Sequence, residues 1–264
     1  MSSLPLFRRS LAESWRSLIG WSLGVLAVLA LYLPLFPAIG GNPDMRELLD
    51  SLPPELVRTI GYDQISTGAG YTQSTFFGLM GFLLLTIAGT AWGTAAIAGD
   101  EETGTLELTL AHGVSRSQVV LERTAAVAVR LAWLSVLATV VILLLNDSAA
   151  LDIEPLNAFA GAAALFGLTF LSGVLAIVVG ALTGRRVYAT TAGAGVAVVG
   201  YALNAVANQN DDLDALHGWS PYHWAFGNSP LMNGADGLLW LNYGIAAVLV
   251  VVAAVALSRR DLKA

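Results

Sequence analysis

The residues best suited to chemistry lie in one polar segment, residues 99–123, which separates two long apolar runs. The segment opens with three consecutive acids, Asp100, Glu101 and Glu102, and continues through Gly-Thr-Leu-Glu to Val-Ser-Arg. Acidic side chains stabilise the first turn of a helix through the macrodipole. We therefore expect a short helix that begins in this acidic run and ends at Gly113. This helix should lie outside the apolar segments, where another molecule can contact it.

Motifs for enzymatic chemistry are missing from the sequence. There is no Gly-x-x-x-x-Gly-Lys-Ser/Thr phosphate loop, so the chain cannot bind ATP in that way and any ATP drive must come from a partner. Neither His-Glu-x-x-His nor Gly-x-Ser-x-Gly occurs, which argues against an intramembrane hydrolase. The chain has no cysteine and hence no thiolate metal site. We expect neither catalysis nor a cofactor on this chain.

Two histidines offer a candidate metal site near the C-terminal end of the sequence. His217 and His223 lie close to three aspartates, which are Asp211, Asp212 and Asp214. The spacing of these residues fits no single helix face, so we predict no metal site there.

The elements that must position these residues are membrane-spanning helices. The 264 residues are 56% hydrophobic and only 12% charged, about half the charge of a soluble domain. A span needs about 20 mostly apolar residues, and six stretches qualify: Leu18–Phe36, Thr75–Ala98, Thr124–Leu145, Asn157–Leu182, Val187–Ala207 and Leu238–Leu257. The alternation of a membrane β-barrel is absent. We predict an all-α membrane protein with six transmembrane helices in one domain, residues 1–264.

The basic residues orient the spans. An even number of spans puts both termini on one side, and placing them in the cytoplasm leaves only Arg46 and Arg58 outside, as the positive-inside rule requires. The inside set is Arg8, Arg9, Arg16, Arg116, Arg123, Arg130, Arg185, Arg186, Arg259, Arg260 and Lys263. We predict a multi-pass protein of the plasma membrane with cytoplasmic N- and C-termini.

Shorter segments flank the spans. Apolar residues at helical spacing predict an amphipathic helix on the inner membrane surface within residues 1–17. The first long outer loop, residues 37–74, should hold a short helix around Met45–Ser51 that Pro53 and Pro54 break. The second, residues 208–237, should form an interfacial or re-entrant element, because its aromatic residues suit the headgroup level.

A capping pattern ends the polar segment. Ser115 and Gln118 form a capping box, in which Ser115 caps and Gln118 reaches back, so a helix should begin at Arg116 and enter the membrane as the third span. Upstream, Thr105–Leu110 alternates polar and apolar residues as a strand would. A lone strand would have no pairing partner, so we favour a short helix. We expect a helix–turn–helix elbow that projects from the bilayer.

Polar and small residues inside the spans give further candidates. Arg130 is the one clear charge within a span, and we expect it to snorkel to the headgroups or to pair with Glu122 or Glu102. Small residues spaced by four predict that the fourth and fifth spans pack as a tight antiparallel hairpin: Ser172, Ala176, Gly180 and Gly184, with Gly193 and Ala197. Two polar stripes remain, Thr86, Thr90 and Thr94 on the second span and Tyr201, Asn204 and Asn208 on the fifth.

The elbow resembles the coupling loop of type-2 ABC exporter permeases, whose pattern is roughly Glu-x-x-x-Gly-Thr-Leu-x-x-Leu-Leu, then Pro-Val-Ser-Arg, then Lys. This chain matches with Asp100, Gly104, Thr105, Leu106, Leu110, Val114, Ser115, Arg116 and Arg123. It departs by having Asp100 for Glu, Thr109 for Leu, Gly113 for Pro and Arg123 for Lys. Ser220-Pro221-Tyr222 and the segment from Asn228 to Gly234 also resemble the last outer loop of that family.

The resemblance implies a permease domain that dimerises, with itself or with a second permease, and docks two separate ATPase subunits. ATP and Mg would bind to those ATPase subunits and not to this chain. The chain itself would contact the lipid bilayer and would not bind nucleic acid. The implied coupling residues are Asp100, Glu101, Glu102, Gly104, Thr105, Leu106, Glu107, Leu110, Val114, Ser115 and Arg116. The second and fifth spans would line the substrate pathway, so their polar stripes could contact substrate or simply bond to neighbouring helices.

The leading hypothesis is an exporter of an amphiphilic drug, antibiotic or lipid-like molecule. An ATP-independent secondary carrier would predict internal repeats and ionisable groups at the membrane midplane, and neither is evident in the sequence. A sensing or immunity subunit that uses the same fold without transport stays open as an alternative.

Overall fold

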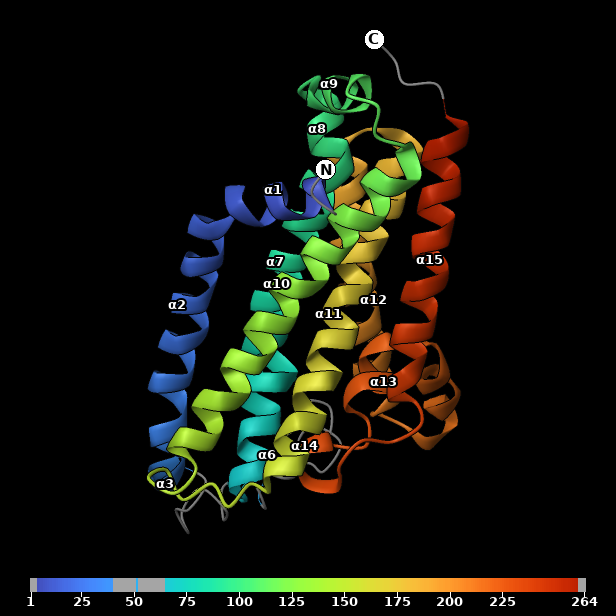
Figure 1. The fold of residues 1–264 in the computed structure, drawn as a ribbon. Helices are drawn as coiled ribbons and strands as arrows, with labels where there is room; N and C mark the ends of the chain where they lie inside the picture. Colours follow the sequence, from blue (N-terminus) through green and yellow to red (C-terminus); the bar gives the residue numbers. More distant parts are fainter. Residues whose placement is uncertain (1–3, 40–50, 52–64, 261–264) are drawn as a thin grey trace.

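The structure is a computed structural model that describes residues 4–39, 51 and 65–260, and within these ranges all regular structure is helical (Figure 1). Six helices in the described ranges are long and apolar enough to cross a membrane: Trp15–Ala38, Gly68–Glu102, Arg116–Leu145, Pro155–Thr183, Arg186–Ala207 and Leu239–Arg259. Each overlaps one of the six predicted spans, so the prediction of an all-α membrane protein is confirmed.

The first span consists of α2 (Trp15–Tyr32), η1 (Leu33–Leu35) and α3 (Phe36–Ile39). The second span is a chain of α6 (Gly68–Thr72), η2 (Gln73–Met80), α7 (Gly81–Thr94), η3 (Ala95–Gly99) and α8 (Asp100–Glu102), in which η2 and η3 are π-helical. The remaining spans are α10 (Arg116–Leu145), α11 (Pro155–Thr183), α12 (Arg186–Ala207) and α15 (Leu239–Arg259).

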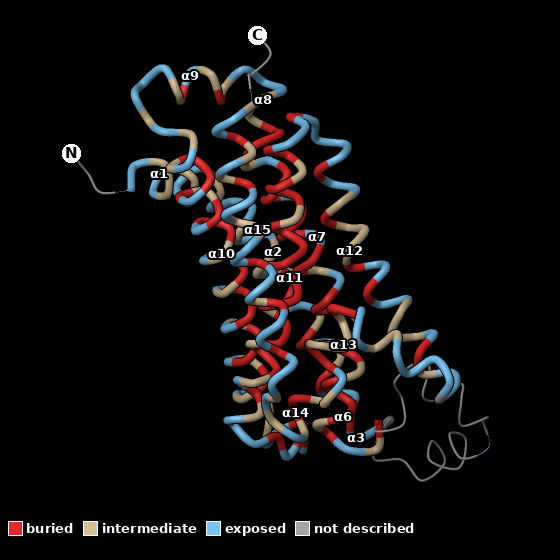
Figure 2. Tube along the Cα trace, turned by 90° about the vertical axis from the view of Figure 1, so that its right-hand side faces the viewer, coloured by how far each residue is buried: buried red, intermediate tan, exposed pale blue. Residues whose placement is uncertain are grey.

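The helix α11 lies at the centre of the bundle and packs against α7, α10, α12 and α15. Glycine makes two of these contacts close: a Cβ atom on Gly93 would lie 2.2 Å from the carbonyl oxygen of Gly173, and one on Gly193 would lie 2.8 Å from that of Ser172. The predicted contact between the fourth and fifth spans is thus present, although Gly180 faces Ala98 of the second span instead. Figure 2 shows that α7 and α11 are largely buried, whereas few residues of α12 are buried.

The second span is longer than predicted at both ends. It begins at Gly68, where Thr67 caps the helix by accepting a hydrogen bond from the Gly70 amide, so the predicted outer loop 37–74 is too long. The helix predicted at Met45–Ser51 and the break after it lie outside the described residues, apart from Ser51. At the other end the helix runs on through Glu102, so the prediction that the three acids begin a helix is wrong.

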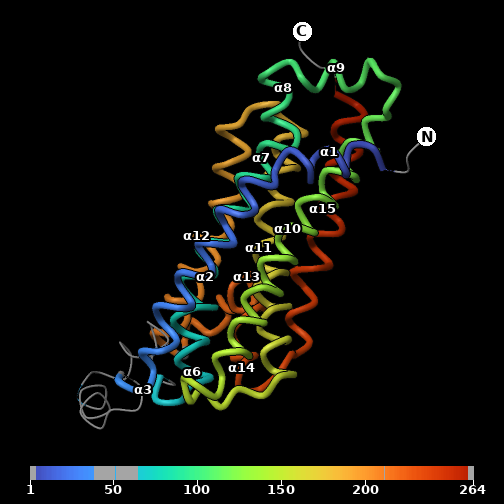
Figure 3. Tube along the Cα trace, turned by 60° about the vertical axis from the view of Figure 1, so that its left-hand side comes forward, coloured from blue at the N-terminus to red at the C-terminus, as the bar shows by residue number. Residues whose placement is uncertain are grey.

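The N-terminal helix α1 (Pro5–Glu13) lies at the same end of the bundle as the loop after the second span and the end of α15, and it turns sharply into α2 (Figures 1 and 3). The amphipathic helix predicted within residues 1–17 is therefore present, but the chain bends at Ser14 and the first span begins at Trp15. We call this end of the molecule the α9 end, after the helix described next.

The polar segment folds as the expected elbow. The residue Gly104 has φ +72°, which breaks the chain between α8 and the short helix α9 (Thr105–Ala111). The hydroxyl of Ser115 accepts a hydrogen bond from the Gln118 amide and starts α10 at Arg116, as predicted. The other half of the capping box is wrong, because the Gln118 side chain donates to Glu122 Oε1 at 2.6 Å instead of reaching back.

The opposite end, which we call the α13 end, carries three short helices: η4 (Asp211–Trp219), α13 (Pro221–Phe226) and α14 (Pro230–Asn233). Ser220 fixes α13 by accepting from the His223 amide while its own hydroxyl donates to the Gly200 carbonyl at 2.6 Å. The helix α13 thereby folds back onto α11, α12 and α15, while Trp219 stays exposed.

Candidate functional site: an arginine-anchored elbow and a groove

The three acids at the base of the elbow each pair with an arginine from a different helix end. Asp100 pairs with Arg123 of α10, Glu101 with Arg260 just beyond α15, and Glu102 with Arg186 at the start of α12. None of these arginines is within 20 residues of its partner in the sequence. The second span is therefore fastened to the third, fifth and sixth at the point where it leaves the bundle.

These arginines offset the unfavourable interaction of the three carboxylates with the C-terminal end of the helix. Carboxylates at the C-terminal end of a helix face the negative end of the macrodipole and are destabilised there. Arg123 and Arg186 also donate to the carbonyls of Ala96 and Gly99, at 2.5 and 2.9 Å, near the helix end. The guanidinium groups thus neutralise the acids and satisfy backbone acceptors near the end of the helix.

The network extends to the remaining helix ends. Arg116, the first residue of α10, donates to the carbonyls of Leu257 and Arg260, at 3.1 Å for Leu257. Gly184 ends α11 with φ +67°, and a Cβ atom there would lie 2.3 Å from Glu101 Oε1. A side chain at this position would be strained by the positive φ, and it would also force the Glu101 carboxylate to move.

The helix α9 presents one large apolar side chain to solvent. Leu106 is fully buried and Leu110 and Val114 are half-buried against the core, so these implied coupling residues hold α9 in place. Leu108 is instead 65% exposed. Sequence reasoning missed Leu108, although residues two apart on a helix point to roughly opposite faces, so a helix that buries Leu106 must turn Leu108 outward.

The other residues implied to couple have structural roles in the same turn. Thr105 accepts a hydrogen bond from the buried Thr109 hydroxyl through its carbonyl, at 2.9 Å. The Oε2 atom of Glu107 is buried and has no hydrogen-bond partner among the described residues. Thr109, which departs from the family pattern, is thus accommodated by an internal hydrogen bond.

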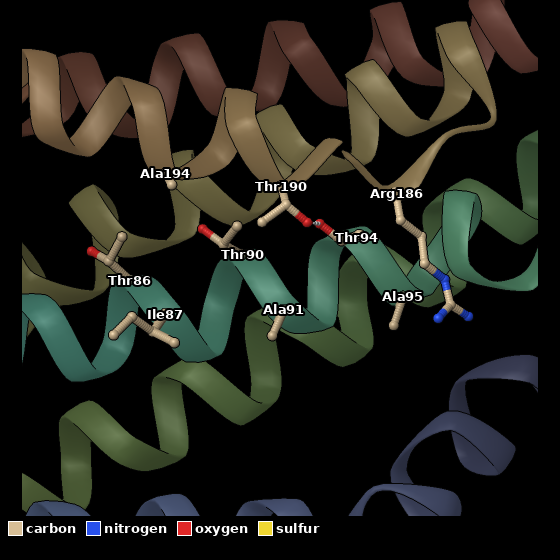
Figure 4. A pocket seen from close by; sticks show the side chains of 9 residues that line it. All are labelled: Thr86, Ile87, Thr90, Ala91, Thr94, Ala95, Arg186, Thr190 and Ala194. Atoms are coloured by element: carbon tan, nitrogen blue, oxygen red, sulfur yellow. Dashed lines mark hydrogen bonds between the residues drawn. The ribbon is translucent and has the colours of Figure 1, made fainter. Parts of the chain in front are cut away.

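A groove of about 350 Å³ lies between α7 and α12 (Figure 4). All three threonines of the predicted stripe line it, and its lining is Thr86, Ile87, Thr90, Ala91, Thr94, Ala95, Arg186, Thr190 and Ala194. The hydroxyls of Thr94 and Thr190 are 3.1 Å apart and join the two walls. Those of Thr86 and Thr90 are buried and have no partner among the described residues. Arg186 occupies the α9 end of the groove.

The second predicted stripe lies elsewhere, in a cluster at the α13 end. Asn204 Oδ1 accepts from His223 Nδ1 at 3.1 Å, and Asn208 Oδ1 is 2.9 Å from His217 Nε2. Tyr201 stacks at right angles on Tyr222, with ring centroids 5.1 Å apart. These side chains contact η4 and α13, and they do not line the groove.

The two histidines of the candidate metal site stack on one another, with ring centroids 3.9 Å apart. His217 also pairs with Asp214 at 2.9 Å. No group of three metal-ligating side chains occurs here or elsewhere in the described ranges. Burial lowers the pKa of His223, and the neighbouring His217 lowers it further against weaker opposing effects of Asp214 and Asp236.

Two buried charges in α10 hold the N-terminal helix. Glu122 Oε2 accepts from the Phe7 amide at 2.9 Å and so caps the first turn of α1. Arg130 donates to Ser10 Oγ at 2.6 Å, and its guanidinium lies 5.1 Å from the ring centre of Trp92. The expectation that Arg130 pairs with Glu122 or Glu102 is wrong, because a serine and an aromatic face satisfy it instead.

Comparison with known proteins places this architecture in a family. A family model described as ABC-2 family transporter protein matches residues 4–262, which is nearly the whole chain. No curated protein matches the sequence significantly. The six spans, the elbow and this match agree with the resemblance carried by the Gly104–Arg116 motif. The chain therefore belongs to the ABC-2 transporter family, as a multi-pass component of membrane transport.

Proposed function

We propose that this chain is the permease subunit of an ATP-driven exporter, in which α9 docks a separate ATPase subunit on the cytoplasmic side. The observation that carries the proposal is the elbow itself: the short helix α9 projects from the bundle and exposes Leu108, and α8 at its base is tied by ion pairs to three other spans. A helix held in this way can pass a displacement at its tip to the spans as a unit.

The charge distribution supports the orientation of this arrangement. The α9 end carries the network of arginines, and basic residues favour the cytoplasmic side of a membrane. ATP and Mg would bind to the partner, in two copies, one for each permease of a homodimer or heterodimer. The cargo would be an amphiphilic drug, antibiotic or lipid-like molecule moved outward between α7 and α12, where the threonine-lined groove lies.

Co-purification from the native membrane tests this proposal. We expect an ATPase at one-to-one stoichiometry, and we expect Leu108→Asn to weaken its binding by about 30-fold, the effect of losing a contact worth about 2 kcal/mol at an interface. Leu182→Asn is the matched control, because Leu182 is a similarly exposed leucine of the bundle outside the elbow. Recovery of the intact chain without any ATPase would refute the proposal, and equal effects of the two variants would refute the role of Leu108.

A further inference from the structure

One residue belongs to both the groove and the elbow. Arg186 lines the groove at its α9 end (Figure 4), and the same side chain lies 3.4 Å from the Glu102 carboxylate and 2.9 Å from the Gly99 carbonyl. The Arg186 amide also donates to Glu102 Oε1 at 2.9 Å. A ligand that binds in the groove therefore reaches the contact that fastens α8 to α12.

Of the three ion pairs at the base of the elbow, this one is the easiest to exchange. The side chains of Arg186 and Glu102 are 50% and 41% exposed, whereas those of Arg260 and Glu101 are 20% and 12% exposed. Exposed ion pairs contribute little to stability because water competes for both partners. A competing anion can therefore replace Glu102 at Arg186 while the two more buried pairs keep α8 attached to α10 and α15.

The chemistry of the groove specifies the class of ligand. Alanines, an isoleucine and threonine methyl groups form its walls, and the buried hydroxyls of Thr86 and Thr90 have no described partner. The volume of about 350 Å³ lies within the range of small-molecule sites. At one end stands a guanidinium, whose planar fork of donors suits a phosphate or carboxylate. The complementary molecule has an apolar chain and one anionic headgroup.

We propose that the groove between α7 and α12 binds an anionic amphiphile whose headgroup displaces Glu102 from Arg186 and so loosens the elbow from α12. The inference rests on the proposed function, because it assigns a substrate class to that permease. It also gives the ligand a route to the ATPase: an occupied groove breaks the guanidinium contact of Glu102, at the base of α9, and leaves only the Arg186 amide to hold that carboxylate to the fifth span.

Direct binding to the purified chain in zwitterionic nanodiscs tests the inference. The probe is radiolabelled dodecyl phosphate, and its competitors are dodecyltrimethylammonium, dodecyl glucoside and inorganic phosphate. We expect saturable binding that falls at least tenfold in Arg186→Gln. We expect Glu102→Gln to bind several-fold more tightly than the natural chain, because the internal competitor for Arg186 has been removed. Arg185→Gln is the charge control, since Arg185 is exposed and outside the groove, and it should bind as the natural chain does.

The two variants are expected to change the affinity for dodecyl phosphate in opposite directions, which makes the result decisive. Unchanged binding in Arg186→Gln, or weaker binding in Glu102→Gln, would overturn the inference. Competition by dodecyltrimethylammonium would overturn the anionic specificity, and competition by inorganic phosphate alone would show that the apolar walls contribute nothing. Should Arg186→Gln fail to fold, Ala194→Phe narrows the groove without changing its charge and should also weaken binding.

The assay contains no ATPase, so its outcome is independent of the co-purification experiment. Loss of the binding result with an ATPase still recovered would leave the permease assignment standing and reject the substrate class. Binding without any ATPase would reject the permease assignment and retain the site.

Discussion

The contact between Arg130 and Ser10 allows a quantitative test of how α1 is held. A hydrogen bond to a charged group contributes about 1.5–3 kcal/mol, and this one joins α1 to the buried face of α10 at 2.6 Å. Its loss should raise the equilibrium constant for detachment of α1 by about 10- to 150-fold, at about 1.4 kcal/mol for each factor of ten. The contact of Arg130 with Trp92 involves α7 and not Ser10. It therefore cancels from the interaction energy when Ser10 and Arg130 are changed singly and together.

The measurement is a double-mutant cycle of Ser10→Ala and Arg130→Met, read by hydrogen exchange of the α1 amides in nanodiscs. We expect each single variant to speed exchange in α1, and the double variant to exchange little faster than either one, with an interaction energy of about 1.5–3 kcal/mol. Ser10→Ala with Arg16→Met is the control cycle, because Arg16 is exposed and packs on Trp15, and it should be additive. Additivity of the Ser10 and Arg130 changes would refute the reasoning.

Two further predictions concern the core and the α13 end. Gly93→Ala should destabilise the fold by about 1–3 kcal/mol through overpacking, because its Cβ would lie 2.2 Å from the Gly173 carbonyl oxygen. The control Gly195→Ala, with open space around it, should be neutral or stabilising by up to about 1 kcal/mol. Equal melting temperatures of the two variants would contradict this account. The lowered pKa of His223 means that the folded protein favours the neutral ring, so the stability that this provides is complete above the ordinary histidine pKa of about 6.5 and is lost as the pH falls below it. The protection of the α13 amides relative to their intrinsic exchange rates should therefore fall on acidification, and His223→Gln, but not the exposed His112→Gln, should remove that dependence.

Local patterns were sufficient to predict the spans and the elbow. Long apolar runs can be satisfied only by helices that cross a membrane, and Ser115 caps α10 through an interaction three residues away. The break at Gly104 was not predicted, because a helix from the acidic run to Gly113 satisfied the same local pattern.

Long-range pairing explains what local patterns could not predict. The macrodipole argument placed the three acids at a helix start, and it failed because arginines 23, 84 and 159 residues away neutralise them at a helix end. The partner of Arg130 is a serine 120 residues earlier in the chain, whereas sequence reasoning considered lipid headgroups and two carboxylates. The groove combines the predicted threonine stripe with Arg186, whose place beside that stripe depends on the packing of α12 against α7.

The pairing of Glu101 with Arg260 has a consequence for biosynthesis. Arg260 follows the last span, so during translation the acids at the base of the elbow reach the membrane surface long before this partner exists. The Glu101 carboxylate at the end of the second span therefore stays unpaired with Arg260 until the sixth span has been synthesised. Attachment of the elbow is thus completed only in a chain that has been made and inserted through the sixth span, so a product truncated before Arg260 would lack one of the three ion pairs at the base of α9.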